Sequence, residues 1–260
     1  MSDFKSVTSR ENSLIKLVSF LQTSAKKRRE SGLFVLEGLR ICLDAMENSI
    51  RFDKLIVSET ALLKQGDTAE LFARNSDECY KIPDSLFLKI SDTKSPQGII
   101  AVCKITDRKS SEINPRGRYV ALENVADPAN LGAVSRTAEA LGADGLILSS
   151  DGCDPYSPKA LRASMGTLLR VPVFVLENFS EEIKKSGLKS YACVVDRNAE
   201  SIMEQEFCGG SVVIIGNEAN GITEKAKAAA DKKVTIPMRG RAESLNAAAA
   251  AAIAIWEMMK

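Results

Sequence analysis

The stretch VTIPMRGRAESLNAAAAAAIAIWEMMK, residues 234–260, closes the chain and carries the pattern on which the predicted fold depends. A β-branched run ends at Pro237, a polar group follows at residues 243–246, and a block of alanines completes the chain. Alanine has the highest helix propensity, so the block predicts a helix with Ser244 as its cap and Asn246 in its first turn. Small side chains let other backbone approach closely, although a tight helical core would use the same composition.

The residues before this stretch alternate between strand and helix patterns. The expected strands cover residues 119–125, 145–150, 171–177, 190–196, 211–218 and 232–238, and the helices between them cover 130–143, 157–169, 180–187 and 222–231. Such alternation predicts an α/β domain with a parallel sheet covered on both faces.

The first part of the chain also has an α/β pattern. Apolar residues at helical spacing predict a helix within 12–29, and strands are expected at 32–38, 52–60 and 97–105. Residues 106–118 are polar and contain Pro115 and Gly117, as a linker would. We therefore expect an N-terminal domain at 1–105, a linker at 106–118 and a second domain at 119–260.

Composition excludes several classes of chemistry. The 260 residues contain no histidine, so histidine bases and histidine metal ligands are ruled out. The six cysteines form no CxxC pair, which argues against a zinc or redox site and predicts reduced thiols. With no membrane-spanning apolar run and no secretory signal pattern, we expect a cytoplasmic protein that does not enter a membrane.

Charge is nearly balanced, with 35 basic and 34 acidic residues, so no overall positive field indicates nucleic acid. Lys26, Lys27, Arg28 and Arg29 nevertheless form a basic row. From the residues alone, this row is either a solvated helix end or an arm that contacts phosphates.

Three strand exits of the second domain carry polar residues: NVADPANLGAVSR after 119–123, NEANG after 211–216 and PMRGRAESLN after 233–236. Ligands of parallel sheets bind at such ends, so three similar exits suggest one shared site. The candidate residues at these exits also have structural explanations. Asn130 could cap a helix, Glu218 could cap the next helix, and Arg136 could simply be exposed to solvent beside the apolar face of its helix. Neither GxxxxGK[ST] nor a GxGxxG after a strand is present. A nucleotide would therefore not be recognised through its phosphates.

Taken together, NVADPANLGAVSRTAEALGADGLIL, IIGNEANGIT and IPMRGRAESLNAAAAAAIAIWE resemble the three motifs of the SpoU (TrmH-type) RNA 2′-O-ribose methyltransferases of the SPOUT class. RESGLFVLEGLRICLDA and DTKSPQGIIAV are similar to that family's N-terminal substrate-binding domain. The resemblance implies a parallel-sheet SPOUT domain with a C-terminal trefoil knot and a smaller L30-like α/β domain. It also implies a homodimer formed through the knotted domain and an RNA substrate, rRNA before tRNA.

The resemblance implies S-adenosylmethionine as cofactor and no metal. The cofactor would be held by Gly216, Asn217, Glu218, Ile236, Met238, Ser244 and Leu245. The residues implied for catalysis are Arg136, Asn130, Glu218, Ser244 and Asn246. RNA would be bound by Lys26, Lys27, Arg28, Arg29 and Arg136.

Two other functions remain open from the sequence. One is a non-catalytic RNA-binding protein of the same fold, and the other is a dehydrogenase with an atypical nucleotide site. Cofactor binding distinguishes them, since only the methyltransferase should bind S-adenosylmethionine and transfer its methyl group.

Overall fold

The structure is a computed structural model that describes residues 3–196, 198–207 and 209–260. Cys208, one of the six cysteines, lies outside the described residues. The chain divides into two compact units: Met1–Thr106 with Tyr156–Arg162, and Asp107–Pro155 with Ala163–Lys260. The first division falls at the start of the predicted linker. The assignment of residues 156–162 to the first unit differs from the predicted domain 119–260.

The first unit contains a five-stranded sheet with the order β1-β4-β3-β5-β2, in which β5 runs antiparallel to both of its neighbours. Its strands are β1 (Lys5–Ser6), β2 (Leu33–Glu37), β3 (Phe52–Ser58), β4 (Ser76–Ile82) and β5 (Ile99–Lys104). Its helices are α1 (Ser13–Thr23), α2 (Ala25–Ser31), α3 (Leu39–Glu47), α4 (Glu59–Lys64), α5 (Gly66–Arg74) and α6 (Asp84–Ile90). Apolar residues of α1 and α6 pack with alternate residues of the sheet in one core.

The predicted helix within 12–29 is two helices, because Ser24 adopts an extended conformation between α1 and α2. Ser24 ends α1 and caps α2 by accepting a hydrogen bond from the Lys27 amide. A hydroxyl that caps a following helix favours such a break.

The segment 156–162 belongs to the first unit through specific contacts. The Tyr156 ring lies 4.9 Å from the ring of Phe34. Arg162 forms a 2.7 Å ion pair with Asp92, and Leu161 is buried. Aromatic packing and burial of this kind bind a segment to its core regardless of its place in the chain.

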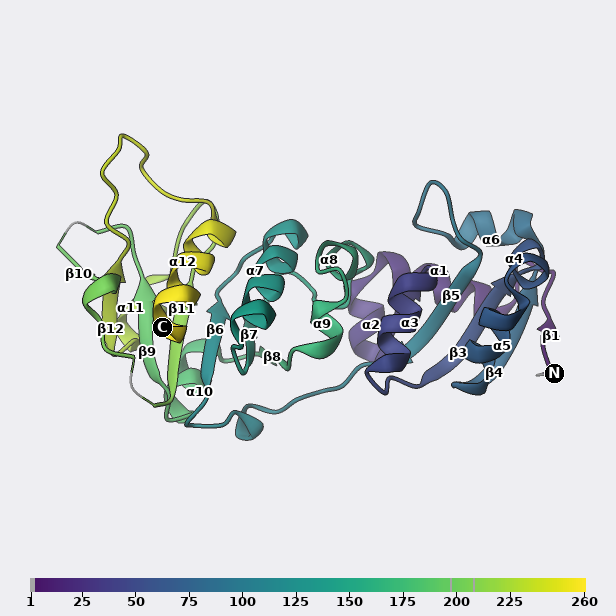
Figure 1. Cartoon of the computed structure of the whole chain (residues 1–260), viewed down its shortest axis with the longest axis horizontal. Coiled ribbons are helices and arrows are strands. Elements are labelled where there is room, and N and C mark those ends of the chain that lie inside the picture. The colour runs from purple at the N-terminus through teal and green to yellow at the C-terminus, as the bar shows by residue number, and fades with distance from the viewer. Residues whose placement is uncertain (1–2, 197, 208) are drawn as a thin grey trace. The chain divides into compact units, whose positions relative to one another are not determined.

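The second unit contains a seven-stranded sheet with the order β10-β12-β9-β11-β6-β7-β8, and all its strand pairs are parallel (Figure 1). The strands are β6 (Arg118–Leu122), β7 (Gly145–Ser149), β8 (Val173–Leu176), β9 (Lys189–Cys193), β10 (Glu200–Ser201), β11 (Ser211–Ile215) and β12 (Lys232–Thr235). The helices of this part of the chain are η1 (Ser110–Glu112), α7 (Pro128–Leu141), α8 (Pro158–Ala163), α9 (Thr167–Arg170), α10 (Phe179–Lys185), η2 (Ile202–Glu204), α11 (Glu224–Ala229) and α12 (Ala247–Met259). The predicted parallel sheet is confirmed.

Helices cover both faces of this sheet. On one face, α10 and α11 pack together over a core that includes Tyr119, Phe174 and Ile214. On the other face, α12 packs against α7, β11 and β6. Ala251 and Ala254 of α12 are fully buried, so the alanine block serves close packing as the sequence suggested.

The predicted helix over 157–169 is also interrupted. Met165 and Gly166 have φ of 52° and 90°, which ends α8 and begins α9. Beside this break, Gly132 of α7 lies so close to the chain that an added Cβ would come within 2.5 Å of the Ala163 carbonyl carbon. Only glycine permits that approach without moving backbone.

Candidate functional site

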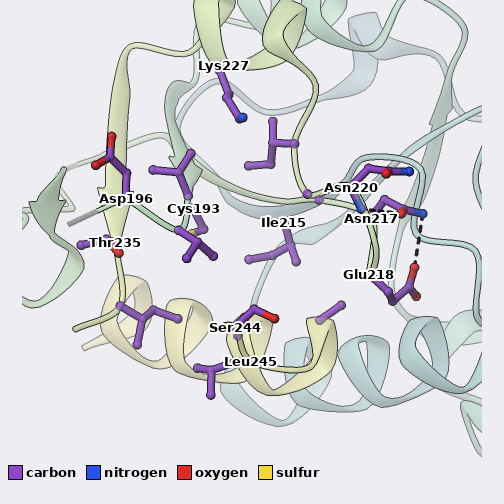
Figure 2. Close-up of a pocket in the computed structure, with 18 of the residues that line it drawn as sticks. Cys193, Asp196, Ile215, Asn217, Glu218, Asn220, Lys227, Thr235, Ser244 and Leu245 are labelled. Atoms are coloured by element: carbon purple, nitrogen blue, oxygen red, sulfur yellow. Dashed lines mark hydrogen bonds between the residues drawn. The ribbon is translucent and has the colours of Figure 1, made fainter. Parts of the chain in front are cut away.

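A pocket of about 550 Å³ opens at the carboxyl ends of β9, β11 and β12. Cys193, Ile215 and Thr235, the last residues of these strands, line it together with Ala247 and Ala250 of α12 (Figure 2). Two of the three predicted strand exits therefore contribute to one cavity, which is where a parallel sheet places its ligands. The volume lies in the range of small-molecule sites.

The loop after β11 forms one wall of the pocket. The backbone of Asn217 and Gly221 makes two hydrogen bonds of 3.0 and 2.9 Å, and the Asn217 side chain accepts hydrogen bonds from Ala219 and Asn220 amides. An added Cβ on Gly216 would lie 2.2 Å from the carbonyl carbon of Gly221. The loop thus folds back on itself over a position that has no room for a side chain.

The buried carboxylate of Glu123 anchors the far end of this loop. Glu123, at the end of β6, is only 5% exposed and accepts hydrogen bonds from the Thr223 amide at 2.8 Å and its hydroxyl at 2.6 Å. Thr223 in turn caps α11. Glu123 was not among the predicted site residues, because it was placed inside the expected strand 119–125, whereas β6 ends at Leu122.

The three strand exits meet in one hydrogen-bonded network of side chains. The Asn130 amide donates to Glu218 at 2.7 Å, and the Asn246 amide donates to Asn130 at 3.0 Å. Residues far apart in the sequence are thereby joined across the ends of β6, β11 and β12, as the strand exits predicted. Each amide has a defined partner, so the hydrogen bonds orient both side chains.

Glu218 is held as a carboxylate. Burial would raise the pKa of Glu218, but hydrogen bonds from Asn130 and from the backbone amides of Ala126 and Asp127 lower its pKa below the ordinary value. Hydrogen bonds to the charged form favour ionisation. At neutral pH this residue is therefore an acceptor and not an acid.

Two of the expected helix caps are wrong. Asp127, not Asn130, caps α7 by accepting from the Ala129 amide, and Pro128 takes the first helical position. Asn246, not Ser244, caps α12 by accepting from the Ala248 and Ala249 amides. Asn130 therefore lies in the first turn of α7, where its side chain is available for the network.

All seven residues predicted to bind the cofactor line the pocket: Gly216, Asn217, Glu218, Ile236, Met238, Ser244 and Leu245. Among the described residues, the backbone groups of residues 237–245 make no hydrogen bond to other backbone groups. Unpaired amides and carbonyls next to a cavity are available to a ligand. The apolar side chains of Met238 and Leu245 are partly exposed beside these groups, which suits a flat aromatic ring.

S-adenosylmethionine fits this combination of features. The pocket offers apolar walls and free backbone groups for an adenosine, a backbone at Gly216 that a ligand can approach closely, and no phosphate cradle. Within the described ranges, no group of acidic or cysteine side chains could hold a metal ion.

Of the residues predicted for catalysis, Glu218 and Ser244 line the pocket, Asn130 and Asn246 are connected to it through Glu218, and Arg136 is neither in the pocket nor in the network. It lies on α7 six residues after Asn130, its side chain is exposed, and it does not line the cavity. Six residues along a helix rotate a side chain to a different face, which separates Arg136 from the network.

The basic row divides into exposed and buried members. Lys26 and Lys27 pair with Glu30 on the surface of α2, and Arg29 is exposed. Arg28 is only 4% exposed and donates to the carbonyl of Leu21, across the break between α1 and α2. The expectation that Arg28 contacts RNA is corrected, because its guanidinium holds two helices together.

Several residues that line the pocket were not foreseen. Asp196, Lys227 and Lys233 add charges to its walls, and Cys193 adds a thiol whose burial raises its pKa to about 12. The described cysteines are free thiols, as the sequence predicted. Lys227 lies in the middle of a helix with an ordinary composition, and nothing in the local sequence distinguishes it from its neighbours.

Two protein-family models match this chain, one in its N-terminal part and one in its C-terminal part. Residues 117–256 match the sequence model of the SpoU rRNA Methylase family, and residues 12–101 match the MRM3-like substrate binding domain. No described helix is long and apolar enough to cross a membrane.

Similar proteins of known name cover nearly the whole chain. The 23S rRNA (guanosine(2553)-2'-O)-methyltransferase RlmP of Bacillus subtilis is 29% identical, over 98% of this chain and 99% of its own. The 23S rRNA (uridine(2479)-2'-O)-methyltransferase of Streptomyces viridochromogenes is 27% identical, over 98% and 91%. The AdoMet-bound rRNA methyltransferase of Sinorhizobium meliloti superposes with a TM-score of 0.85 at 28% identity, over 98% of this chain and 97% of that one. The architecture is that of the SPOUT class, of which the trefoil knot is a known feature.

Proposed function

Because the chain belongs to the SpoU rRNA methylase family, we propose that it transfers a methyl group from S-adenosylmethionine to the 2′-hydroxyl of a ribose in structured RNA, rRNA rather than tRNA. The observation that carries the proposal is the network of Glu218, Asn130 and Asn246 at the edge of a cofactor-sized pocket. The names of the relatives support rRNA as the substrate, and they differ in the nucleotide that is modified.

The chain's own residues would align the reacting groups. When bound, S-adenosylmethionine supplies a methyl group on a positively charged sulfur. A ribose hydroxyl is a poor nucleophile near neutral pH, so it must be oriented and its developing charge stabilised. The ionised Glu218 orients Asn130, and Asn130 is also bonded to Asn246. Ser244 lines the pocket beside them and would complete the contacts to the ribose.

Arg136 would bind the RNA phosphate next to the target and stabilise the developing alkoxide. A guanidinium has a pKa above about 12, so it acts as a fixed positive charge more readily than as a base. Its exposed position on α7 is consistent with a role toward a partner and not toward its own pocket.

We also propose that two copies of the chain associate through the second unit. Ile253 and Trp256 of α12 are 38% and 57% exposed, and α12 packs beside α7, which carries Arg136. A partner packed on these helices would cover the exposed apolar side chains and place its Arg136 near the pocket. Light scattering after gel filtration measures this directly, and a monomer at micromolar concentration would contradict it.

The first unit would recognise the RNA. It matches a substrate binding domain, and Lys26, Lys27 and Arg29 are exposed on α2. Surface lysines and arginines of this kind contribute salt-dependent affinity for phosphates. An rRNA substrate would also place the protein in the cytoplasm.

The test combines cofactor binding with methyl transfer. We expect the wild-type protein to bind S-adenosylmethionine in calorimetry and to methylate rRNA. Arg136→Ala should abolish transfer while cofactor affinity stays within a few-fold. Arg116→Ala, which removes an exposed arginine of the same unit, is the matched control. A protein that binds rRNA but not the cofactor would instead be the non-catalytic RNA-binding alternative, and binding of NAD(H) in its place would favour a dehydrogenase.

A further inference from the structure

Lys227 places a positive charge in a pocket whose other charged walls are mostly acidic. The described lining residues include three carboxylates, Asp196, Glu218 and Glu224, and two amines, Lys227 and Lys233. Figure 2 shows Lys227 reaching from α11 into the cavity, between the ends marked by Glu218 and Asp196. A ligand with one negative group would bind most favourably with that group next to these amines.

The position of Lys227 is fixed by the fold of the site. Thr223 caps α11 and is held by the buried Glu123, and the Lys227 amide donates to the Thr223 carbonyl at 2.9 Å. Ala226, the next residue toward the N-terminus, is buried in the core under the helix. The backbone of Lys227 is therefore anchored through Thr223 and Glu123 to the end of β6, the strand next to β11 in the sheet.

Lys227 and Lys225 differ although they lie on the same helix. The Lys227 side chain is 27% exposed, whereas that of Lys225 is 70% exposed and pairs with Glu181. Lys227 itself pairs at 2.8 Å with Glu224, whose side chain is 88% exposed. Such a solvated pair is weak and can be exchanged for another carboxylate.

S-adenosylmethionine has a single negative group, the carboxylate of its methionine part. For the proposed transfer, its methyl group would face the network of Asn130 and Glu218, and its adenosine would take the apolar walls near Leu245. The methionine arm is then left for the remaining charged wall. Resting on the function proposed above, we infer that the Lys227 ammonium binds the methionine carboxylate of the cofactor and selects ligands that carry it.

Lys233 is the other amine that could take this role. It is exposed on β12, and among the described residues it forms no ion pair. A fully hydrated amine gains less from a carboxylate than one that is partly withdrawn from water, which favours Lys227.

The experiment compares S-adenosylmethionine with decarboxylated S-adenosylmethionine by calorimetry, so that only the carboxylate differs. We expect the wild type to bind the intact cofactor at least about tenfold more tightly, the effect of one charged hydrogen bond. Lys227→Met should bind both ligands equally, and Lys227→Arg should keep most of the preference. Lys225→Met is the matched control and should behave as the wild type, and circular dichroism checks that each variant is folded.

Each outcome decides the inference. It is overturned if Lys227→Met keeps the preference, if Lys233→Met loses the preference while Lys227→Met does not, or if the wild type shows none. A wild type that binds intact S-adenosylmethionine in any of these cases leaves the proposed function standing. A wild type that binds neither ligand would defeat the proposed function itself.

Discussion

Gly216→Ala is the substitution for which the structure predicts the sharpest effect. The added methyl group would meet three backbone atoms, at 2.2 Å from the Gly221 carbonyl carbon, 2.3 Å from the Ile222 nitrogen and 2.5 Å from the Gly221 oxygen. Backbone atoms cannot relieve such a clash by a change of rotamer, as side-chain atoms can, so the loop must open. Opening it breaks the two hydrogen bonds between Asn217 and Gly221.

The cost can be worked from these contacts. Two backbone hydrogen bonds at ~1 kcal/mol each give about 2 kcal/mol, and overpacking of a tight site adds about 1–3 kcal/mol, for a total of about 3–5 kcal/mol. For a chain of this size that lowers the melting temperature by about 6–20 °C. Because the displaced loop carries Asn217 and Glu218, cofactor affinity should fall as well, by about tenfold or more.

Differential scanning calorimetry and titration with S-adenosylmethionine measure the two effects. Gly240→Ala is the matched control, since an added Cβ there meets nothing within 4 Å. It should change neither the melting temperature nor the affinity measurably. If Gly216→Ala melted within 1–2 °C of the wild type, by the same conversion, and bound the cofactor normally, the steric argument for this loop would be refuted.

Two further substitutions test other parts of the structure. The pKa of Glu218 is lowered from 4.5 on folding, so its stabilising effect is complete above pH 4.5 and disappears as the pH falls through the lower folded value. Solvent screens this exposed carboxylate, so Glu218→Gln should lower the free energy of unfolding at pH 7 by less than about 1 kcal/mol, and the gap to wild type should close below pH 4.5; a gap independent of pH in thermal melts would contradict this. Arg28→Ala should lower the free energy of unfolding by about 2–3 kcal/mol and Arg29→Ala by less than about 0.5 kcal/mol, measured in urea; equal effects would show that burial of Arg28 is unimportant.

The spacing of apolar residues along the sequence was sufficient to predict most of the helices and strands. Buried β-branched runs such as residues 212–215 were predicted to be strands, and they are. The interruptions were missed, because they depend on single residues. Ser24 breaks one predicted helix by capping the next, and Met165 and Gly166 break another through positive φ angles. Local patterns do not report such changes, since the residues on both sides keep their helical spacing.

The predicted helix caps failed for a different reason. Asp127 and Asn130 are both residues that can cap a helix, as are Ser244 and Asn246. In each pair, the residue that caps is the one whose side chain can reach the first free amides, and this depends on where the chain leaves the strand. Asn246 both caps α12 and donates to Asn130, so one side chain serves the helix and the site.

The sequence by itself determined the parallel α/β architecture, the exclusion of histidine and phosphate-loop chemistry, and the strand exits where a site could form. Those properties follow from residue types and their spacing along the chain. Only the tertiary structure decided that Asn130, Glu218 and Asn246 are hydrogen-bonded to one another, that Lys227 faces the pocket while Lys225 does not, and that Arg28 is buried. These depend on the order of strands in the sheet and the rotation of each helix on it, which are set by packing between residues distant in sequence.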